Sequence, residues 1–322
     1  MRIGMIGTGS MARKMTETIL AMTEVECYAV ASRDYQRAEQ FRKEFGLEKA
    51  YGSYEEMAMD PEVDLIYIAS PHSHHYEHAK LCLSHKKPLL IEKAFTVNAA
   101  QARELFSIAE KTGTFFTEAV WVRYMPMRKK MDEILQSGVL GEISSLTANF
   151  GHPLQSIQRL CDPALAGGAL LDLGVYPINF AFMVFGNQVT SVSSSVVMSE
   201  TGVDARNSIT LLFENGKMAV LHSNMTAKTD QTGVVFGSKG YMVVENINNI
   251  SGIRVFDQNG CETAYYERPE QISGYEYEVE ASVRAMRDGK TECQEMPHED
   301  TLRIMELMDQ LRSDWNLVFP CE

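Results

Sequence analysis

Residues 3–12 read IGMIGTGSMA, and this stretch decides the fold. An apolar run breaks into Gly-x-Gly-x-x-Ala and continues as RKMTETIL, which has helical spacing. A strand, a glycine turn and a helix in this order form the phosphate cradle of a dinucleotide-binding fold. In such a cradle Gly7 permits the tight turn, Gly9 lets the backbone approach a pyrophosphate, and Ala12 lets helix and strand pack closely. The free N–H groups at the start of the helix favour an anion there.

The bulk composition is that of an ordinary globular protein. The chain has 322 residues, of which 45% are hydrophobic and 23% charged, and this length favours two domains. A net charge of -13 argues against nucleic acid and against a membrane surface as partners. The six cysteines form no C-x-x-C pair, which indicates reduced thiols and a cytoplasmic protein. We find no signal peptide before the first strand and no apolar run of about 18 residues that would span a membrane.

The first part of the chain alternates strand-like and helix-like segments. Strands are expected at 24–31, 63–69, 88–91 and 114–117, and helices at 36–45, from 53, at 74–84 and at 99–111. This alternation predicts a parallel sheet whose ligands lie at the carboxyl ends of the strands. We therefore predict a dinucleotide-binding Rossmann domain over residues 1–119.

The end of the second strand bears on the choice of cofactor. Sites for NAD carry an Asp or Glu here that binds the ribose hydroxyls. This chain has Ser32 at that position, followed by Arg33 and, one helical turn later, Arg37. A hydroxyl and guanidinium groups suit a 2′-phosphate, so the sequence favours NADP, with NAD possible. In the alternative interpretation Arg33 is a solvated loop residue and Asp34 supplies the acid.

A run of histidines follows the third predicted strand. Pro71 leads into His72, and His74 and His78 have the i, i+4 spacing that can chelate zinc on a helix. No cysteine or carboxylate has a recognised ligand spacing beside them, and the H-E-x-x-H order is absent. We therefore expect no metal, and interpret the run as a strand-to-helix corner beside the cofactor or solvent.

Glu92 and Lys93 follow the next apolar run, at the edge of the sheet where ligands bind. An ammonium group at this place could hydrogen-bond a substrate hydroxyl and lower its pKa during oxidation. Glu92 could orient the lysine or contact the ribose. The alternative is a solvated surface lysine.

The second part of the chain changes character. Strands are expected at 143–150, 206–213, 218–225, 253–256 and 262–266, and helices at 128–136, 275–287 and 299–314. Asn215-Gly216 and Asn259-Gly260 each join two of these runs and are strong hairpin signals. We therefore predict an α+β domain over residues 120–322, built on an open-faced, predominantly antiparallel sheet.

Residues 166–178, AGGALLDLGVYPI, stand out within this domain. Asp172 and Tyr176 are four residues apart and would share one face of a helix. The preceding glycines would let the start of that helix lie close to another surface. A phenol and a carboxylate on one face could form a proton-transfer pair, whereas the alternative is a buried Asp that caps a turn and a Tyr that fills the core.

Several of these motifs together resemble the Gfo/Idh/MocA oxidoreductases. The resemblance rests on GTGSMA (7–12), ASRD (31–34), IASPHSHH (68–75), EKA (92–94) and GGALLDLGVY (167–176). It extends through nearly the whole chain, and EAVWVRYMP (118–126) is most similar to the branch with dimeric dihydrodiol dehydrogenase and NADP-dependent D-xylose 1-dehydrogenase. Ala94 replaces the proline that usually follows the family's lysine, and we expect a looser turn there but no lost chemistry.

The resemblance implies roles for individual residues. Lys93 matches the lysine beside the nicotinamide and the reacting carbon, Tyr176 the catalytic position, and Asp172 the acidic residue one turn earlier. Trp121 and Arg123 match residues that close over the cofactor, and Arg159 is a candidate for contact with substrate or a cofactor phosphate. The residues expected to bind the cofactor are Gly7, Thr8, Gly9, Ser10, Met11, Ala12, Ser32, Arg33, Arg37, Ala69, Ser70, Pro71, His72, His75, Glu92, Lys93, Trp121 and Arg123. Those expected to bind substrate are Lys93, Arg159, Asp172 and Tyr176, within a pocket lined by segments 150–162 and 225–233.

The resulting hypothesis is an NADP-dependent dehydrogenase that acts on a secondary alcohol in a sugar, polyol or cyclic diol. A homodimer or higher homo-oligomer through the C-terminal sheet is expected, because relatives often associate in this way. The alternatives are a non-catalytic NADP-sensing regulatory protein of the same fold and a metal-dependent enzyme using residues 72–78.

Overall fold

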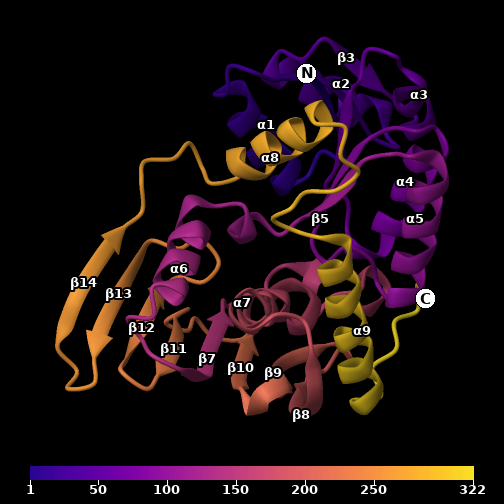
Figure 1. Cartoon of the computed structure of the whole chain (residues 1–322). Helices are drawn as coiled ribbons and strands as arrows, with labels where there is room; N and C mark the ends of the chain where they lie inside the picture. The colour runs from indigo at the N-terminus through magenta and orange to yellow at the C-terminus, as the bar shows by residue number, and fades with distance from the viewer. The chain divides into compact units, whose positions relative to one another are not determined.

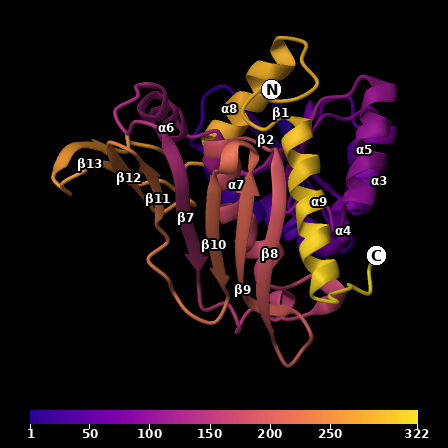
Figure 2. The ribbon, with the colours of Figure 1, turned by 60° about the horizontal axis from the view of Figure 1, so that its bottom comes forward.

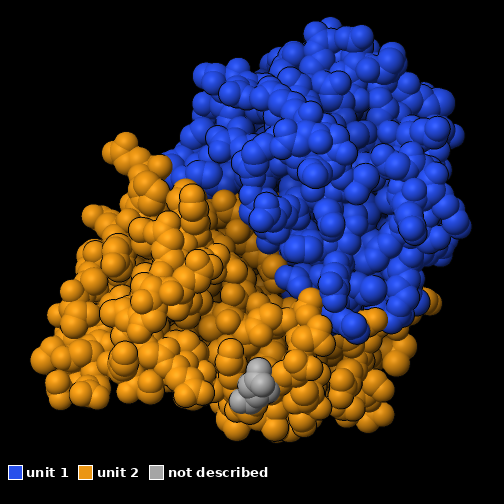
Figure 3. All heavy atoms as spheres, in the orientation of Figure 1, with its two compact units in different colours: residues 1–120, 271–305 blue, residues 121–270, 306–322 orange. Residues whose placement is uncertain are grey.

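The computed structural model describes residues 1–214 and 216–322, and within these ranges the chain forms two compact units. Unit 1 comprises Met1–Val120 and Gln271–Met305, and unit 2 comprises Trp121–Glu270 and Glu306–Glu322 (Figure 3). The segment from Gln271 to Met305 therefore belongs with the N-terminal part of the chain. The functional division at residues 119 and 120 stays a prediction.

Unit 1 is a doubly wound α/β structure (Figure 1). Its six-stranded sheet has the order β3-β2-β1-β4-β5-β6, and all its recorded strand pairs are parallel. The strands are β1 (Arg2–Ile6), β2 (Glu26–Ala31), β3 (Lys49–Tyr51), β4 (Leu65–Ile68), β5 (Leu89–Glu92) and β6 (Phe116–Ala119). The helices are α1 (Ser10–Leu20), α2 (Tyr35–Phe45), α3 (Tyr54–Met59), α4 (His72–Ser84), α5 (Ala99–Thr112) and α8 (Glu276–Arg287).

The Rossmann prediction is confirmed, and the deviations have local causes. The three-residue strand β3 was missed because it is too short to show a period. Helix α4 begins at His72, two residues before its predicted start, directly after Pro71 at its N-cap. Strand β6 lies two residues later than predicted. The Ser53 cap is confirmed, since its hydroxyl accepts from the Glu56 N–H at 3.4 Å.

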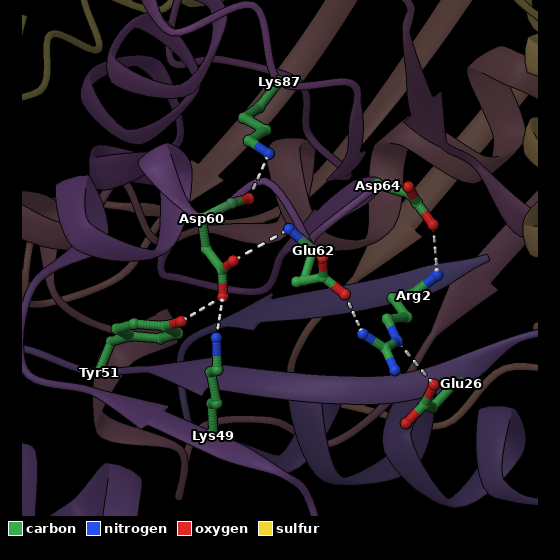
Figure 4. Close-up of polar contacts among 8 residues, drawn as sticks. All are labelled: Arg2, Glu26, Lys49, Tyr51, Asp60, Glu62, Asp64 and Lys87. Atoms are coloured by element: carbon green, nitrogen blue, oxygen red, sulfur yellow. Dashed lines mark hydrogen bonds and ion pairs between the residues drawn. The ribbon is translucent and has the colours of Figure 1, made fainter.

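A polar network in unit 1 joins the beginnings of β1, β2 and β4 to β3 (Figure 4). The Asp60 carboxylate accepts hydrogen bonds from Tyr51 and from Lys49, whose Nζ lies 2.9 Å away. The Arg2 guanidinium pairs with Glu26 and Glu62. Burial by itself raises the pKa of Asp60, but the hydrogen bonds from Tyr51, Lys49 and the Glu62 backbone N–H lower it to about 2. The carboxylate therefore stays ionised and stabilises the sheet at all but strongly acidic pH.

Unit 2 contains an eight-stranded sheet of order β14-β13-β12-β11-β7-β10-β9-β8 (Figure 2). Its recorded strand pairs are antiparallel except for the parallel pair β7 and β10. The strands are β7 (Ile143–Gly151), β8 (Val189–Met198), β9 (Asp204–Phe213), β10 (Met218–Asn224), β11 (Gly233–Gly237), β12 (Gly240–Glu245), β13 (Gly252–Asp257) and β14 (Glu262–Glu267). The helices are α6 (Pro126–Gln136), α7 (Val175–Phe185) and the last part of α9 (His298–Asp314), which begins in unit 1.

The predicted open-faced, mainly antiparallel sheet is confirmed. Helix α7 packs on β7 and β10 and covers one face of the sheet (Figure 2). The hairpin of β9 and β10 is confirmed by its pairing, although Asn215 in its turn lies outside the described residues. Strands β8, β11 and β12 were missed. Five of the ten residues of β8 are serine or threonine, so the sequence lacks a clean apolar alternation.

One segment contradicts the expectation about apolar runs. Residues Pro163–Phe185 are long and apolar enough to cross a membrane by length and composition, yet 89% of the relevant window is buried inside the structure. A buried core helix of a globular protein has the same composition. Here the segment contains α7, which lies against the sheet of unit 2.

Candidate functional site

The glycine turn between β1 and α1 forms a cradle for an anion in unit 1. Gly7 has a φ of +104°, and a Cβ on it would lie 3.1 Å from the carbonyl oxygen of Ala69. A Cβ on Gly9 would meet nothing within 4 Å, so the space beside this glycine is open. Helix α1 begins at Ser10 after Gly9 at its N-cap, without a side-chain cap and without an acidic residue in its first turn. The uncapped N–H groups and the open space therefore fit a pyrophosphate.

The polar residues after β2 divide into a cap and exposed cations. The Asp34 carboxylate accepts from the backbone N–H of Gln36 at 2.9 Å and caps α2. Arg33 and Arg37 are exposed, and Arg37 Nε lies 3.6 Å from Asp34 Oδ2. Ser32 is nearly buried, and its hydroxyl accepts from the Asp34 N–H at 3.3 Å. The Asp34 carboxylate thus caps α2 through Oδ1 and lies beside Arg37 through Oδ2, and Arg33 is a second exposed guanidinium group at this strand end.

The His75 ring lies between two backbone carbonyls, one just after β4 and one at the residue after Lys93. Its Nε2 lies 2.7 Å from the carbonyl oxygen of Ser70, and its Nδ1 lies 2.9 Å from that of Ala94. Burial lowers the pKa of His75 to about 4, so at neutral pH the ring is uncharged and donates through one nitrogen. His78 Nδ1 lies 3.0 Å from the Ser70 hydroxyl, and burial lowers the pKa of His78 to about 3.

The other histidines of this run are also committed to local contacts. His72 is buried, with its ring edge-to-face against His75 at 5.7 Å between centroids. His74 Nδ1 lies 2.8 Å from the Ser73 hydroxyl. Within the described part of the chain, no group of three or more His, Cys, Asp or Glu side chains is placed to hold a metal ion.

Lys93 follows a buried polar pair at the end of β5. The Glu92 carboxylate accepts from the Lys93 backbone N–H at 3.2 Å, and its other oxygen accepts from the Tyr67 hydroxyl. Burial, reinforced by the Glu92 charge, raises the pKa of Tyr67 well above its usual value, so the phenol remains a donor. The Lys93–Ala94 peptide is cis, and Ala94 is buried. The sequence analysis missed Tyr67, which looks like any aromatic residue of a buried strand.

In unit 2, Asp172 and Tyr176 lie on the segment that leads into α7. Residues Leu170–Gly174 form a π-helical turn, so the predicted α-helix through Asp172 is wrong before Val175. Such wide turns inside helices are frequent at functional sites. Both side chains are mostly buried, and the Tyr176 ring lies 5.0 Å from that of Phe150, between centroids.

The glycines before this turn allow the predicted close approach. A Cβ on Gly167 would lie 2.5 Å from the carbonyl oxygen of Leu160, and one on Gly168 would lie 2.2 Å from Asp204 Oδ1. Neither position therefore accepts a side chain without displacement of backbone or of a buried carboxyl.

Several polar groups surround Asp172 within unit 2. Arg159 Nη2 lies 3.9 Å from Asp172 Oδ1. His152 lies near enough for the Asp172 charge to raise its pKa, although burial and Lys228 lower it overall. His152 Nε2 lies 2.6 Å from Gln231 Nε2, so the amide donates to the ring. His152 and Gln231 fall in the segments expected to line the pocket, but their pairing could not be read from residues so far apart in sequence.

Trp121 and Arg123 make their recorded hydrogen bonds inside unit 2. Trp121 Nε1 donates to Asn248 Oδ1 at 2.8 Å, and Arg123 Nε donates to Asn179 Oδ1 at 2.6 Å. Both side chains are buried. Asn179 lies on α7, so Arg123 fixes the turn Trp121–Arg123 to the helix that follows Tyr176.

We expect Gly9→Ala to separate cofactor binding from folding. The new methyl group meets no protein atom, so the free energy of unfolding should change by less than about 1 kcal/mol. NADPH should bind at least about tenfold more weakly, because the methyl group would occupy the space expected for the pyrophosphate. Urea unfolding and quenching of protein fluorescence by NADPH measure the two effects. Gly7→Ala is the contrasting variant and should also destabilise the fold, because its φ is positive. Unchanged NADPH affinity in Gly9→Ala would contradict the cradle.

Comparison with known proteins agrees with this geometry. Residues 1–120 match the family described as "Oxidoreductase family, NAD-binding Rossmann fold", and residues 129–243 match the "GFO/IDH/MocA C-terminal domain". The chain is 34% identical to trans-1,2-dihydrobenzene-1,2-diol dehydrogenase of Mus musculus, over 99% of this chain and 98% of the relative. It is 39% identical to the protein of that name from Bos taurus, over 74% of this chain and 72% of the relative.

Solved structures give the same result for the fold. A 3-ketoreductase from Actinomadura kijaniata, in complex with NADP and TDP-benzene, superposes with a TM-score of 0.89 at 26% identity, and 97% of each chain is covered. An aldose-aldose oxidoreductase from Caulobacter crescentus superposes with a TM-score of 0.87 at 18% identity, over 97% of this chain and 96% of that one. This chain therefore belongs to the Gfo/Idh/MocA family of oxidoreductases.

Proposed function

We propose that this chain is an NADP-dependent dehydrogenase that acts on the secondary alcohol of a sugar, polyol or cyclic diol. The observation that carries the proposal is the cradle at Gly9, where open space lies beside an uncapped helix N-terminus. The vertebrate relatives named trans-1,2-dihydrobenzene-1,2-diol dehydrogenase support a cyclic diol. The 3-ketoreductase crystallised with NADP supports the cofactor and the interconversion of hydroxyl and ketone.

The cofactor contacts follow the strand ends of unit 1. The turn from Gly7 to Ala12 would hold the pyrophosphate, and Ser32, Arg33 and Arg37 the 2′-phosphate. The remaining contacts are assigned to Ala69, Ser70, Pro71, His72, His75, Glu92, Lys93, Trp121 and Arg123. The exposed guanidinium groups and the engagement of Asp34 in capping α2 support NADP over NAD.

Tyr176 is assigned the transfer of the hydroxyl proton. Bound NADP supplies the hydride acceptor at C4 of its nicotinamide. The Tyr176 phenolate would accept the proton of the substrate hydroxyl, and the Lys93 ammonium would stabilise the developing alkoxide. Asp172, held near Arg159 at 3.9 Å, would bind and orient the substrate. In the opposite direction the same residues would donate a proton to a ketone or lactone.

Two variants test this division of roles. Lys93→Ala and Tyr176→Phe should each lower kcat by about 10²-fold or more, since each removes an acid–base or electrostatic contribution. The NADP dissociation constant of Tyr176→Phe should stay near the wild-type value. Stopped-flow and steady-state rates with a panel of aldoses, inositols and cyclic diols provide the measurement and also identify the substrate class. Near-normal rates in Lys93→Ala with unchanged NADP affinity would refute the mechanism.

The choice of cofactor depends on Arg33 in this proposal. Arg33→Ala should weaken NADP binding by roughly 10-fold to 100-fold, because charge-assisted hydrogen bonds contribute about 1.5–3 kcal/mol. Binding of NAD, which lacks the 2′-phosphate, should be unchanged. Fluorescence titration with both nucleotides measures the difference, and Lys43→Ala, which removes an exposed cation on α2, the helix that follows Arg33, is the matched control. An equal loss for NAD and NADP would argue against this role.

We also propose that the chain forms a homodimer or higher homo-oligomer through the open face of the unit 2 sheet. Met218, Val220 and Phe236 point away from the buried face and are between 37% and 44% exposed. Tyr241 and Phe256 stack on that face with ring centroids 4.7 Å apart. Such apolar patches are typical of interfaces.

Val220→Lys should shift sedimentation equilibrium toward the monomer, because it places a charge within this patch. Val318→Lys, at an exposed position outside the patch, should not shift it. A monomeric wild type would contradict the proposal.

All six cysteines are free thiols in the structure, at positions 27, 82, 161, 261, 293 and 321. We propose a cytoplasmic location on this ground, because reduced thiols persist there.

A further inference from the structure

A buried carboxyl in unit 2 lies against the start of the segment that carries Asp172 and Tyr176. Asp204, the first residue of β9, is 1% exposed. Its Oδ2 accepts from the Leu170 backbone N–H at 2.8 Å and from Asn207 Nδ2 at 2.9 Å. Its Oδ1 is buried and has no hydrogen-bond partner among the described residues, because it faces the bare Cα of Gly168.

This carboxyl serves a helix terminus that has no cap of its own. The helical segment begins next to Gly168, and the turn Leu170–Gly174 starts without a side-chain cap. The first N–H groups of a helix lack intrahelical partners and are best satisfied by a negatively charged acceptor. Asp204 supplies that acceptor from β9 and binds the N–H of Leu170. Leu170 lies two residues before Asp172 and six before Tyr176.

The network continues from Asp204 to the other end of the π-helical turn. Ser223 donates from Oγ to Asn207 Oδ1 at 2.8 Å, and these two residues are register partners on β10 and β9. A Cβ on Gly174 would lie 3.3 Å from the Ser223 hydroxyl. The hydrogen-bonded series Asp204–Asn207–Ser223 therefore binds the turn at Leu170 and lies close to it again at Gly174.

The protonation state of Asp204 changes near neutral pH. Burial raises the pKa of Asp204 to about 7, against the opposing effects of Asn207, the Leu170 N–H and Arg312. Arg312 on α9 is itself paired with Asp309 at 2.9 Å and with Glu322. The packed elements also carry Arg206 of β9, His222 of β10, Asp172 of the π-helical turn, Tyr176 of α7, and Glu306 and Asp314 of α9. A protonated carboxyl accepts more weakly from Leu170, and its proton finds no acceptor at Gly168.

We propose that Asp204 is a positioning residue: its ionised carboxyl fixes the first turn of the segment that presents Asp172 and Tyr176, and protonation loosens that turn and slows the reaction. The inference rests on the proposed role of Tyr176. It makes stability and activity respond to pH in opposite directions. Because the pKa of Asp204 is raised in the folded state, protonation of this group stabilises the fold as pH falls from about 7 toward about 4. Enzyme activity should decline as pH falls through about 7, because the same protonation loosens the turn.

The decisive variant is Asp204→Asn, which is nearly isosteric and does not titrate. In the wild type, kcat for alcohol oxidation with saturating NADP should show an inflection near pH 7 in addition to that of the catalytic base. In Asp204→Asn this inflection should vanish, and kcat at pH about 8.5 should fall by about tenfold because the turn is no longer fixed. The NADP dissociation constant should not change, and the variant should be at least as stable as the wild type above pH 7, since it buries no charge.

Asp257→Asn is the matched control. Asp257 also accepts from backbone N–H groups in unit 2, those of Asn259 at 2.8 Å and Cys261 at 2.9 Å, but its pKa is lowered. Its replacement should leave the pH profile of kcat unchanged. Persistence of the neutral inflection in Asp204→Asn, or loss of stability in parallel with activity, would overturn the proposal.

A measurement on the wild type keeps the test independent of folding of the variant and of the catalytic mechanism. Amide hydrogen exchange over residues 168–172, corrected for the intrinsic pH dependence, should be faster at pH 6 than at pH 8 as the cap weakens. Equal protection at both values would overturn the proposal. Retained activity in Tyr176→Phe would instead refute the assigned mechanism, so the two failures are distinguishable.

Discussion

The close approach of Gly7 to the carbonyl of Ala69 fixes the edge of the unit 1 sheet on which the proposed cofactor site depends. The Gly7 N–H donates to Ala31 at 3.0 Å, and the Ala69 N–H donates to Ile6 at 3.0 Å, so the ends of β2, β1 and β4 are tied into one edge. Strands β1 and β4 are neighbours at the point where the strand order reverses. Ligands of doubly wound sheets bind at that point. A residue with a Cβ at Gly7 would need both a rare φ and a displaced β4, and would therefore alter the whole edge.

The sheet of unit 1 was predictable because its buried strands are continuous apolar runs bounded by glycine, proline and capping residues. β4 and β5 are fully buried and lie close to their predicted positions. The prediction failed where the sequence signal depends on tertiary contacts. β3 has three half-buried residues, and β8 exposes many of its residues, so neither has the period of a strand with one apolar face. The π-helical turn at Leu170–Gly174 is invisible in a pattern that fits an α-helix equally well.

The site residues divide in the same way. The proposed catalytic residues Lys93, Asp172 and Tyr176 stand in short motifs, so they could be predicted from a single sequence. The residues that hold these side chains in place do not stand in such motifs. Tyr67 reaches Glu92 across neighbouring strands, His152 meets Gln231 from another segment, and Asp204 caps a helix that precedes it in sequence. Each depends on a register or loop conformation that only the folded structure supplies. A signal in the sequence was the polar residues Asn207 and Ser223, which alternate with apolar residues such as Ile209 and Leu221 at the inward-facing positions of β9 and β10.

The composition of unit 1 has a consequence for how the protein is made. Its sheet is complete at residue 120, but α8 and the segment to Met305 belong to the same unit. The Glu118 carboxylate, for example, accepts from the Thr301 hydroxyl at 3.0 Å. Residues 121–270 leave the ribosome in between, so the N-terminal unit waits for its last helix until the other unit's sheet has been synthesised. During that interval the groups of unit 1 that bind the segment 271–305, such as Glu118, lack these partners. Residues 306–322 are synthesised after that segment and complete unit 2, so each unit is finished only after part of the other has been made.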